Sequence, residues 1–273
     1  MQPIFDFAGF DLPAYRTFTI LALFVGFGVA VVVAVRRGIS ARTACGVAVA
    51  AIVGGLVGGR LFAAATAAEP FWGDAGAVFE LRFGSMAMFG GLLGAAAAGT
   101  VAARTLGVSP LRFGDAAAPA LGIGIALLRV GCLLAGDCFG KVTGLFWGIT
   151  YPRGSFVHLY QIESGQSILG VLRGTGPVHP IPVYEMLAGL LLASAAVVVI
   201  RRGMRDGTAL AVVVAGYGLV RLLIEPLRAP EPGSTPAWFD PVVFTTAALF
   251  AIIWLAWPHL VERRYAKRSL ATA

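Results

Sequence analysis

The fold of this chain is decided by residues 119–141, which read PALGIGIALLRVGCLLAGDCFGK. The first half is an apolar run without any charge, and it ends on Arg129. Similar runs recur along the 273 residues, of which 58% are hydrophobic and 13% charged, whereas about a quarter of a soluble domain is charged. Long apolar blocks with so few charges are typical of membrane-spanning helices, which satisfy their own backbone hydrogen bonds inside the bilayer.

Seven such blocks are long enough, or nearly so, to cross a bilayer core of about 30 Å. Basic connections follow the first, third, fifth and seventh blocks, and basic connections stay in the cytoplasm. The sequence therefore predicts an all-α integral membrane protein with seven transmembrane helices, its N-terminus outside and its C-terminus cytoplasmic. We expect one polytopic domain over residues 1–273, with a small extracytoplasmic segment at 137–181 between helices 4 and 5. The blocks lie near residues 17–35, 45–66, 84–103, 113–136, 182–200, 207–224 and 241–260.

Three arginines, Arg60, Arg129 and Arg221, lie well inside predicted spans. A charge deep in a bilayer costs about 2.5–3.5 kcal/mol on insertion scales, so something must offset it. One explanation is structural, with ion pairs and snorkelling side chains; Glu225, for example, follows Arg221 by four residues. The other is a polar cavity open to the outer leaflet, because a guanidinium group binds phosphate through two charge-assisted hydrogen bonds. The guest of that cavity would be a phospholipid head group.

Two cysteines, Cys132 and Cys138, lie six residues apart just after Arg129. Their spacing is not that of a zinc site and no histidine cluster accompanies them, so we expect no metal. Three interpretations stay open. Both cysteines can serve as small apolar side chains, they can form a disulfide near an oxidising outer face, or Cys132 can carry an acyl or diacylglyceryl group transiently. Cys45 is most simply a packing residue.

Residues 119–141 resemble the most characteristic region of prolipoprotein diacylglyceryl transferases. The stretches GSMAMFGGLLG (84–94), HPIPVYE (179–185) and RLLIEPLRAPE (221–231) resemble further segments of that family, in the same order. In the first region Asp137 stands where the family has Glu, and Lys141 where it has Arg. The matching residues there are Gly124, Ala126, Arg129, Gly131, Gly136 and Gly140.

The resemblance implies an enzyme that moves the diacylglyceryl group of phosphatidylglycerol onto the thiol of a lipobox cysteine in a prolipoprotein. Glycerol phosphate would be released at the outer face of a bacterial cytoplasmic membrane, without a cofactor and without nucleic acid. By resemblance, Arg129 would bind the head-group phosphate, Arg221 would stabilise the leaving phosphate, and Glu225 would orient Arg221. The candidate substrate-binding residues are Arg129, Gly131, Gly136, Asp137, Gly140, Arg60, His179, Tyr184 and Glu185.

Three positions depart from the family pattern. A histidine of the family falls on Phe89, an asparagine on Cys132 and a tyrosine on Phe18. The first change removes the obvious general base. His179 is a possible substitute, although it can equally be a residue that fixes the entry to the next helix. His158 is a weaker candidate, and His259 is not one.

Two other functions remain open because of these departures. One is a divergent paralogue that binds or modifies phospholipid without prolipoprotein transferase activity. The other is a transporter or channel-like bundle.

Overall fold

The computed structural model describes residues 4–7, 10–66, 88–165, 174–229 and 241–256. Their contacts divide the chain into two compact units. One unit, called the site unit below, comprises residues 1–22 and 121–273, and the other comprises residues 23–120. Two helices contribute to both units.

The described helices overlap all seven predicted blocks, and most boundaries differ from the predicted ones by only a few residues. They are α1 (Ala14–Arg36), α2 (Ala41–Thr66), α3 (Met88–Thr105), α4 (Pro110–Ala135), α7 (Ile181–Arg201), α8 (Thr208–Ile224) and a helix at Pro241–Ala256. Five helices in the described part are long and apolar enough to cross a membrane. They are Ala14–Arg36, Ala41–Ala65, Pro110–Ala135, Ile181–Arg201 and Thr208–Leu227. The prediction of a mainly helical chain with several helices able to span a membrane is therefore confirmed.

A short β-hairpin precedes α1 and was missed by the sequence analysis. Strands β1 (Ile4–Phe7) and β2 (Phe10–Pro13) pair antiparallel, with Ile4 opposite Pro13 and Phe7 opposite Phe10. Each strand has four residues, which is too short for an alternating pattern to stand out beside the apolar blocks. The all-α prediction is corrected to this extent.

In the unit of residues 23–120, α2 and α3 pack directly backbone to backbone. A Cβ atom added at Gly94 would lie 2.1 Å from the carbonyl oxygen of Gly54, and one added at Gly90 would lie 2.3 Å from that of Gly58. Small residues at four-residue spacing permit this approach. Near the other end of α2, Arg37 pairs with the buried Asp115 at 3.3 Å.

We expect Gly94→Ala to destabilise the α2–α3 pair by roughly 1–3 kcal/mol, because backbone atoms would have to move to admit the methyl group. The matched control is Gly28→Ala in α1, where an added Cβ meets nothing within 4 Å. The measurement is thermal unfolding of both variants in detergent. Equal unfolding temperatures for Gly94→Ala and the wild type would contradict the close packing.

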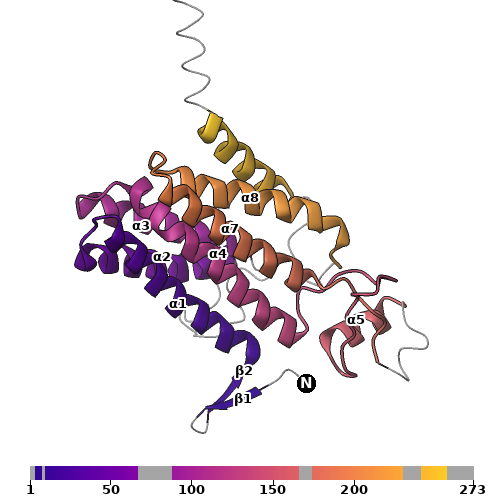
Figure 1. The fold of residues 1–273 in the computed structure, drawn as a ribbon. Coiled ribbons are helices and arrows are strands. Elements are labelled where there is room, and N and C mark those ends of the chain that lie inside the picture. The colour runs from indigo at the N-terminus through magenta and orange to yellow at the C-terminus, as the bar shows by residue number, and fades with distance from the viewer. Residues whose placement is uncertain (1–3, 8–9, 67–87, 166–173, 230–240, 257–273) are drawn as a thin grey trace, which may run out of the picture. The chain divides into compact units, whose positions relative to one another are not determined.

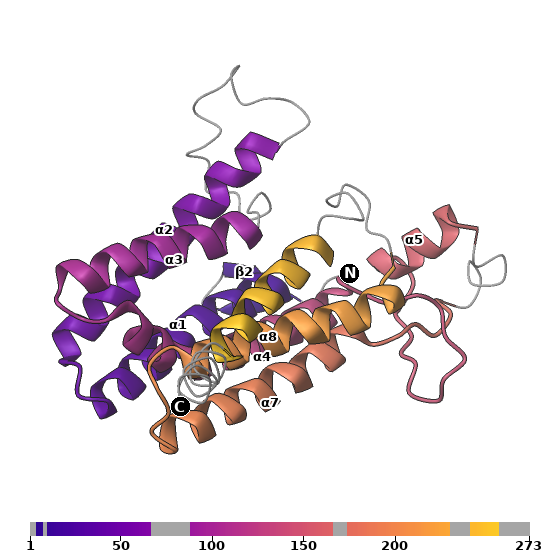
Figure 2. The same ribbon diagram turned by 90° about the horizontal axis from the view of Figure 1, so that it is seen from above.

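In the site unit, the second half of α4 crosses α7 at another pair of glycines. A Cβ added at Gly122 would lie 2.5 Å from the carbonyl oxygen of Gly189. Helices α7 and α8 follow each other in the chain and lie side by side in both ribbon views (Figures 1 and 2). These contacts bring the last turns of α4, the first turns of α7 and the last turns of α8 to the same end of the unit.

The connection between α4 and α7 forms a small folded element at that end (Figure 1). It contains α5 (Phe156–Glu163), whose first turn is capped by the Ser155 hydroxyl, which accepts a hydrogen bond from the His158 backbone N–H at 3.2 Å. Val178 forms isolated bridges with Val142 and Ile149, which tie separate parts of the connection together. A separate apolar core holds the element together and consists of Phe139, Val157, Val178 and Ala229.

Candidate functional site

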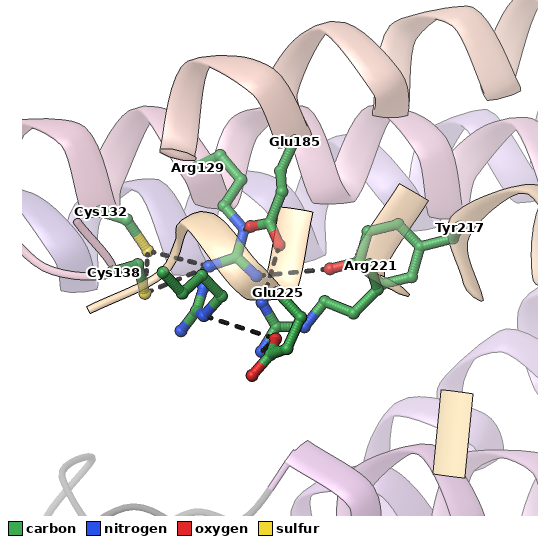
Figure 3. A network of polar contacts seen from close by, with 8 residues as sticks. Arg129, Cys132, Cys138, Glu185, Tyr217, Arg221 and Glu225 are labelled. Carbon is green, nitrogen blue, oxygen red and sulfur yellow. Dashed lines mark hydrogen bonds and ion pairs between the residues drawn. The ribbon is translucent and has the colours of Figure 1, made fainter. Parts of the chain in front are cut away.

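The predicted site is organised around Glu185, whose side chain is completely buried. This carboxylate pairs with two arginines from two other helices: its Oε2 with Nε of Arg129, and its Oε1 with Nη1 of Arg221 at 3.4 Å (Figure 3). The side chains of Arg129 and Arg221 are themselves 13% and 6% exposed. The two arginines therefore converge on one carboxylate and do not end in separate contacts.

A second carboxylate extends the cluster toward the end of α8. Glu225 Oε2 lies 3.4 Å from Nη2 of Arg221 and 3.9 Å from Nε of Arg228. Glu225 is 31% exposed, whereas Glu185 is not exposed at all. The cluster therefore runs from a fully buried, dry centre at Glu185 to a partly exposed rim at Glu225. Three guanidinium groups face two carboxylates in this chain of contacts, which leaves one positive charge in formal excess.

Local sequence explains why these groups can meet. Arg221 lies in the last turn of α8, and Glu225 opens the 3-10 turn η3 (Glu225–Leu227) that follows, so a spacing of four puts both on one face. Pro226 lacks a backbone N–H, in agreement with the predicted end of the helix there. Glu185 enters from the start of α7, where Pro182 occupies the first turn.

Arg129 has three further partners in the site. Its Nη2 donates to the hydroxyl of Tyr217 at 3.3 Å, and its Nη1 lies 3.2 Å from Sγ of Cys138 and 3.6 Å from Sγ of Cys132 (Figure 3). The guanidinium group is thus held on one edge by a carboxylate and on the other by two sulfur atoms and a phenol. A buried charge with this many partners has a fixed orientation, which is what recognition of an anionic group requires.

Sequence reasoning missed Tyr217 as a site residue. The signal that could have found it is its position four residues before Arg221, which places both on the same face of α8. Arg228 was matched in the sequence but not placed in the site, and it closes the rim of the cluster. The contact between Cys138 and Arg129 could not have been found by helical spacing, since Cys138 lies beyond the end of α4.

Gly140 ties the ends of α4, α7 and α8 together. Its backbone N–H donates to the carbonyl oxygen of His179, and the N–H of Lys141 donates to that of Leu227, at 3.0 and 2.8 Å. A Cβ added at Gly140 would lie 2.5 Å from Cβ of His179. Gly140 was predicted as a substrate-binding residue, and the structure gives it a close-approach role in the frame of the site.

Gly131 is a position where a side chain would collide, and Gly136 is one where a side chain would strain the backbone. A Cβ at Gly131 would lie 2.9 Å from Cβ of Phe18, at the start of α1. Gly136 has a φ of 75°, which ends α4 in a left-handed turn, and Cys138 follows with a φ of 56°. Asp137 lies between them, half-buried, with its N–H bonded to the Cys132 carbonyl oxygen. The four residues from Gly136 onward therefore return the chain toward the end of α4.

His179 and Tyr184 are close to Glu185 in the sequence, but their side chains form a second polar group with partners outside the arginine cluster. Nδ1 of His179 lies 3.4 Å from the hydroxyl of Tyr184, which also accepts a hydrogen bond from Nε1 of Trp147 at 2.7 Å. These contacts attach the connecting element to the first turn of α7. They fit the alternative, stated from the sequence, that His179 fixes the entry to this helix.

The remaining predicted residues lie elsewhere. Arg60 is on α2 and Phe89 is on α3, both in the unit of residues 23–120 and not in the site unit. His158 is buried within α5, where Nδ1 accepts from the N–H of Gly154 at 3.3 Å. His259 lies outside the described residues.

Tyr151 lies next to the site, with its ring against Gly136. Its hydroxyl oxygen is buried, and among the described residues it has no hydrogen-bond partner. Burial raises the pKa of Tyr151 to about 12, and the acidic groups of Cys132, Asp137 and Cys138 add to the rise. Because the folded-state pKa lies above the usual value of about 10, the neutral phenol contributes stability below about pH 10, and this contribution is lost as the pH rises toward 12.

We therefore expect Tyr151→Phe to be as stable as the wild type near pH 7, or more stable by up to about 1 kcal/mol, since an unpartnered buried hydroxyl is removed. Between about pH 10 and 12 the variant should lose less stability than the wild type. The measurement is the thermal unfolding temperature as a function of pH. A variant that is destabilised at neutral pH would reveal a bound partner for this hydroxyl.

The arrangement is suited to holding an anion at the end of three helices. The excess positive charge, the dry centre and the guanidinium forks can stabilise negative charge that develops on a phosphate ester. The described site contains thiols, phenols and carboxylates but no histidine within the arginine cluster.

A model of the family described as "Prolipoprotein diacylglyceryl transferase" matches residues 2–259.

Three curated relatives carry the name phosphatidylglycerol–prolipoprotein diacylglyceryl transferase. The protein of Geobacter sulfurreducens is 33% identical over 155 residues, which cover 56% of this chain and 52% of that protein. The protein of Caulobacter vibrioides (strain NA1000 / CB15N) is 33% identical over 195 residues, 68% and 62% of the two chains. That of Legionella pneumophila (strain Paris) is 29% identical over 185 residues, 67% and 64%. The matched part thus spans between half and two thirds of these relatives.

Proposed function

Since the chain belongs to the prolipoprotein diacylglyceryl transferase family, we propose that it transfers the diacylglyceryl group of phosphatidylglycerol to the lipobox cysteine thiol of a prolipoprotein. Glycerol phosphate is the leaving group. The observation that carries the proposal is the convergence of Arg129 and Arg221 on the buried Glu185. This arrangement supplies two oriented guanidinium groups next to a third, in a setting where charge–charge interactions are stronger than in water.

Each residue of the cluster has a distinct part in the proposed reaction. Arg129 binds the head-group phosphate, and Arg221 stabilises the charge that grows on the glycerol phosphate as the ester bond breaks. Glu185 holds both guanidinium groups in place, and Glu225 orients Arg221 from the rim. Asp137 and Tyr184 belong to the proposed substrate-binding surface, together with Gly131, Gly136, Gly140 and His179.

The proposed reaction takes place at the outer face of a bacterial cytoplasmic membrane. Seven spans, with the N-terminus outside and the C-terminus in the cytoplasm, put the ends of α4 and α8 and the start of α7 on that face. The proposal is supported by helices in all seven predicted places and by the alternating charge of their connections. Phosphatidylglycerol then reaches the site from the outer leaflet, and the prolipoprotein peptide from the same side.

An assay with purified protein, phosphatidylglycerol and a lipobox peptide tests the proposal directly. Release of glycerol phosphate together with a diacylglyceryl adduct on the peptide cysteine is the expected result. A peptide with Ser in place of that cysteine serves as the control. Well-folded protein that yields neither product would overturn the transferase proposal.

A second candidate is a divergent paralogue that binds or modifies phospholipid without this transfer. It is favoured by one specific observation, namely that Phe89, Cys132 and Phe18 stand where the family has polar side chains. Such a protein would retain phosphatidylglycerol through purification but release no glycerol phosphate in the presence of the peptide.

A further inference from the structure

We propose that Cys132 and Cys138 are an oxidation site: the two thiols form a reversible disulfide that lies directly against the guanidinium group of Arg129. The disulfide itself does not depend on the function proposed above. Only its effect on turnover rests on that function.

The geometry that carries the proposal is the distance between the two sulfur atoms. Sγ of Cys138 lies 3.6 Å from Sγ of Cys132, and no disulfide joins them in this structure (Figure 3). A disulfide requires about 2.05 Å, so the two sulfurs have to move together by little more than a bond length. Small side-chain rotations in the turn are enough for a movement of this size.

The backbone between the two cysteines is already folded for the bond. Gly136 and Cys138 both have left-handed φ values, and the N–H of Asp137 bonds to the carbonyl oxygen of Cys132 at 3.0 Å. Cys138 is the one non-glycine residue with a positive φ in the described part of the chain. A side chain normally avoids this region, so the conformation that directs the second thiol at the first is an uncommon one.

The surroundings of the two cysteines leave the pair accessible to small reagents, so the two thiols are more than packing residues of the core. Cys132 is buried, but Cys138 is only half-buried, at the point where the chain leaves α4. Nη1 of Arg129 lies 3.2 Å from Sγ of Cys138 and can stabilise its thiolate, which is the form that attacks a disulfide. Under the proposed orientation this end of α4 faces an oxidising compartment.

The oxidation is a thiol–disulfide exchange with an external disulfide. The Cys138 thiolate attacks one sulfur of that reagent, giving a mixed disulfide and releasing the first thiol of the reagent. Cys132 then attacks Sγ of Cys138, which forms the Cys132–Cys138 bond and releases the second thiol. The protein loses two protons and two electrons, and the external disulfide is reduced to two thiols.

Formation of the disulfide changes the contacts between Arg129 and the two sulfur atoms. The sulfur atoms that lie near Nη1 are drawn toward each other, and a disulfide is a weaker acceptor than a thiolate. We expect the oxidised protein to release glycerol phosphate more slowly by roughly tenfold, at the lower end of the effect of losing one hydrogen bond to a charged group. Reduction should restore the rate.

The test uses the full-length protein in detergent, treated with glutathione disulfide and then analysed by intact mass and by maleimide labelling of unreacted thiols. The expected result is the loss of two hydrogen atoms, with Cys132 and Cys138 blocked together and Cys45 still reactive. Cys45→Ser is the matched control and should form the same bond, since Cys45 lies on α2 in the other unit. Cys132→Ser and Cys138→Ser should instead give a glutathione adduct or no reaction.

Failure of the disulfide and failure of the proposed function are distinguishable. If both thiols remain open to maleimide after oxidation, or if only a glutathione adduct forms in the wild type, the oxidation site is wrong whatever the activity. If the bond forms but neither redox state releases glycerol phosphate, the disulfide stands and the transferase proposal fails. If the bond forms and the rate is unchanged, the proposed influence on Arg129 is overturned.

Discussion

Arg129→Ala is expected to lower the rate of glycerol phosphate release by roughly 10²–10³-fold. A loss of this size is typical when one preorganised donor to a developing negative charge is removed. The physical reason is that Arg129 brings a fixed guanidinium fork, held by Glu185, Tyr217 and the two cysteine sulfurs, to the end of α4. The substitution by alanine removes the positive charge, the paired N–H donors and the volume of the side chain at the same time.

Arg129→Lys separates charge from geometry. Lysine keeps the positive charge and can still pair with Glu185, but it cannot offer two parallel hydrogen bonds to a phosphate. We expect this variant to fold as well as the wild type and to remain well below it in turnover. Arg104→Ala, a change at an exposed arginine in the last turn of α3, is the control for loss of a basic side chain and should keep full activity.

The rate with phosphatidylglycerol and lipobox peptide is measured alongside the thermal unfolding temperature of each variant. Arg129→Ala with full turnover would exclude Arg129 from phosphate binding and would remove the central support for the proposed site. In a strain depleted of its own transferase, the same variant should fail to restore lipoprotein modification.

Glu185→Ala is expected to be the most destabilising single substitution in the site, at about 3–5 kcal/mol, because it removes the buried partner of two buried cations. Arg129 and Arg221 would then repel each other across the gap. Arg129→Ala should cost less, since Glu185 would still pair with Arg221. Glu185→Ala is therefore expected to lose more stability than Arg129→Ala, because Glu185 is the partner that both arginines share.

Glu185→Gln tests whether charge or shape is responsible. The amide keeps the size of the side chain and an acceptor oxygen but leaves the two guanidinium groups without their common counter-charge. We expect a stability between that of the wild type and that of Glu185→Ala, with reduced turnover. Glu163→Ala, a change at an exposed residue at the end of α5, is the matched control and should change neither.

A double-mutant cycle between Glu185→Ala and Arg221→Ala measures the shared contact. Residues in one buried ion-pair network commonly couple by about 0.5–3 kcal/mol. We expect the double variant to be more stable than the sum of the single losses predicts, since it no longer buries an unpaired charge. Strictly additive losses would contradict a direct Glu185–Arg221 interaction.

The positions of the helices could be predicted because the apolar blocks report them directly. A span has to satisfy its own backbone bonds and to match the thickness of the bilayer, so its length and composition are visible in the chain. The β1–β2 hairpin could not, because eight residues provide too little pattern. The close pairing of Gly54 in α2 with Gly94 in α3 is likewise visible only in the structure.

For the site, an arginine deep in an apolar run was enough to identify Arg129 and Arg221 as unusual. The sequence could not show that both share Glu185, because the three residues are separated by up to 92 positions and lie on three helices. It suggested Glu225 as the partner of Arg221 through helical spacing, and that pair is present at 3.4 Å. Gly140 was predicted as a substrate-binding residue, whereas its contacts show that the lack of a side chain lets its backbone lie directly against that of His179.

Composition and block length by themselves determined that this chain is a helical membrane protein and that its buried arginines need partners. The cost of a charge in hydrocarbon makes such residues stand out without any knowledge of the fold. Which partners they have was decided by tertiary structure, because close crossing of helices and a left-handed turn after α4 bring distant side chains within hydrogen-bonding range. Spacing along one helix encodes contacts within a few residues, and contacts between helices depend on packing that no local pattern records.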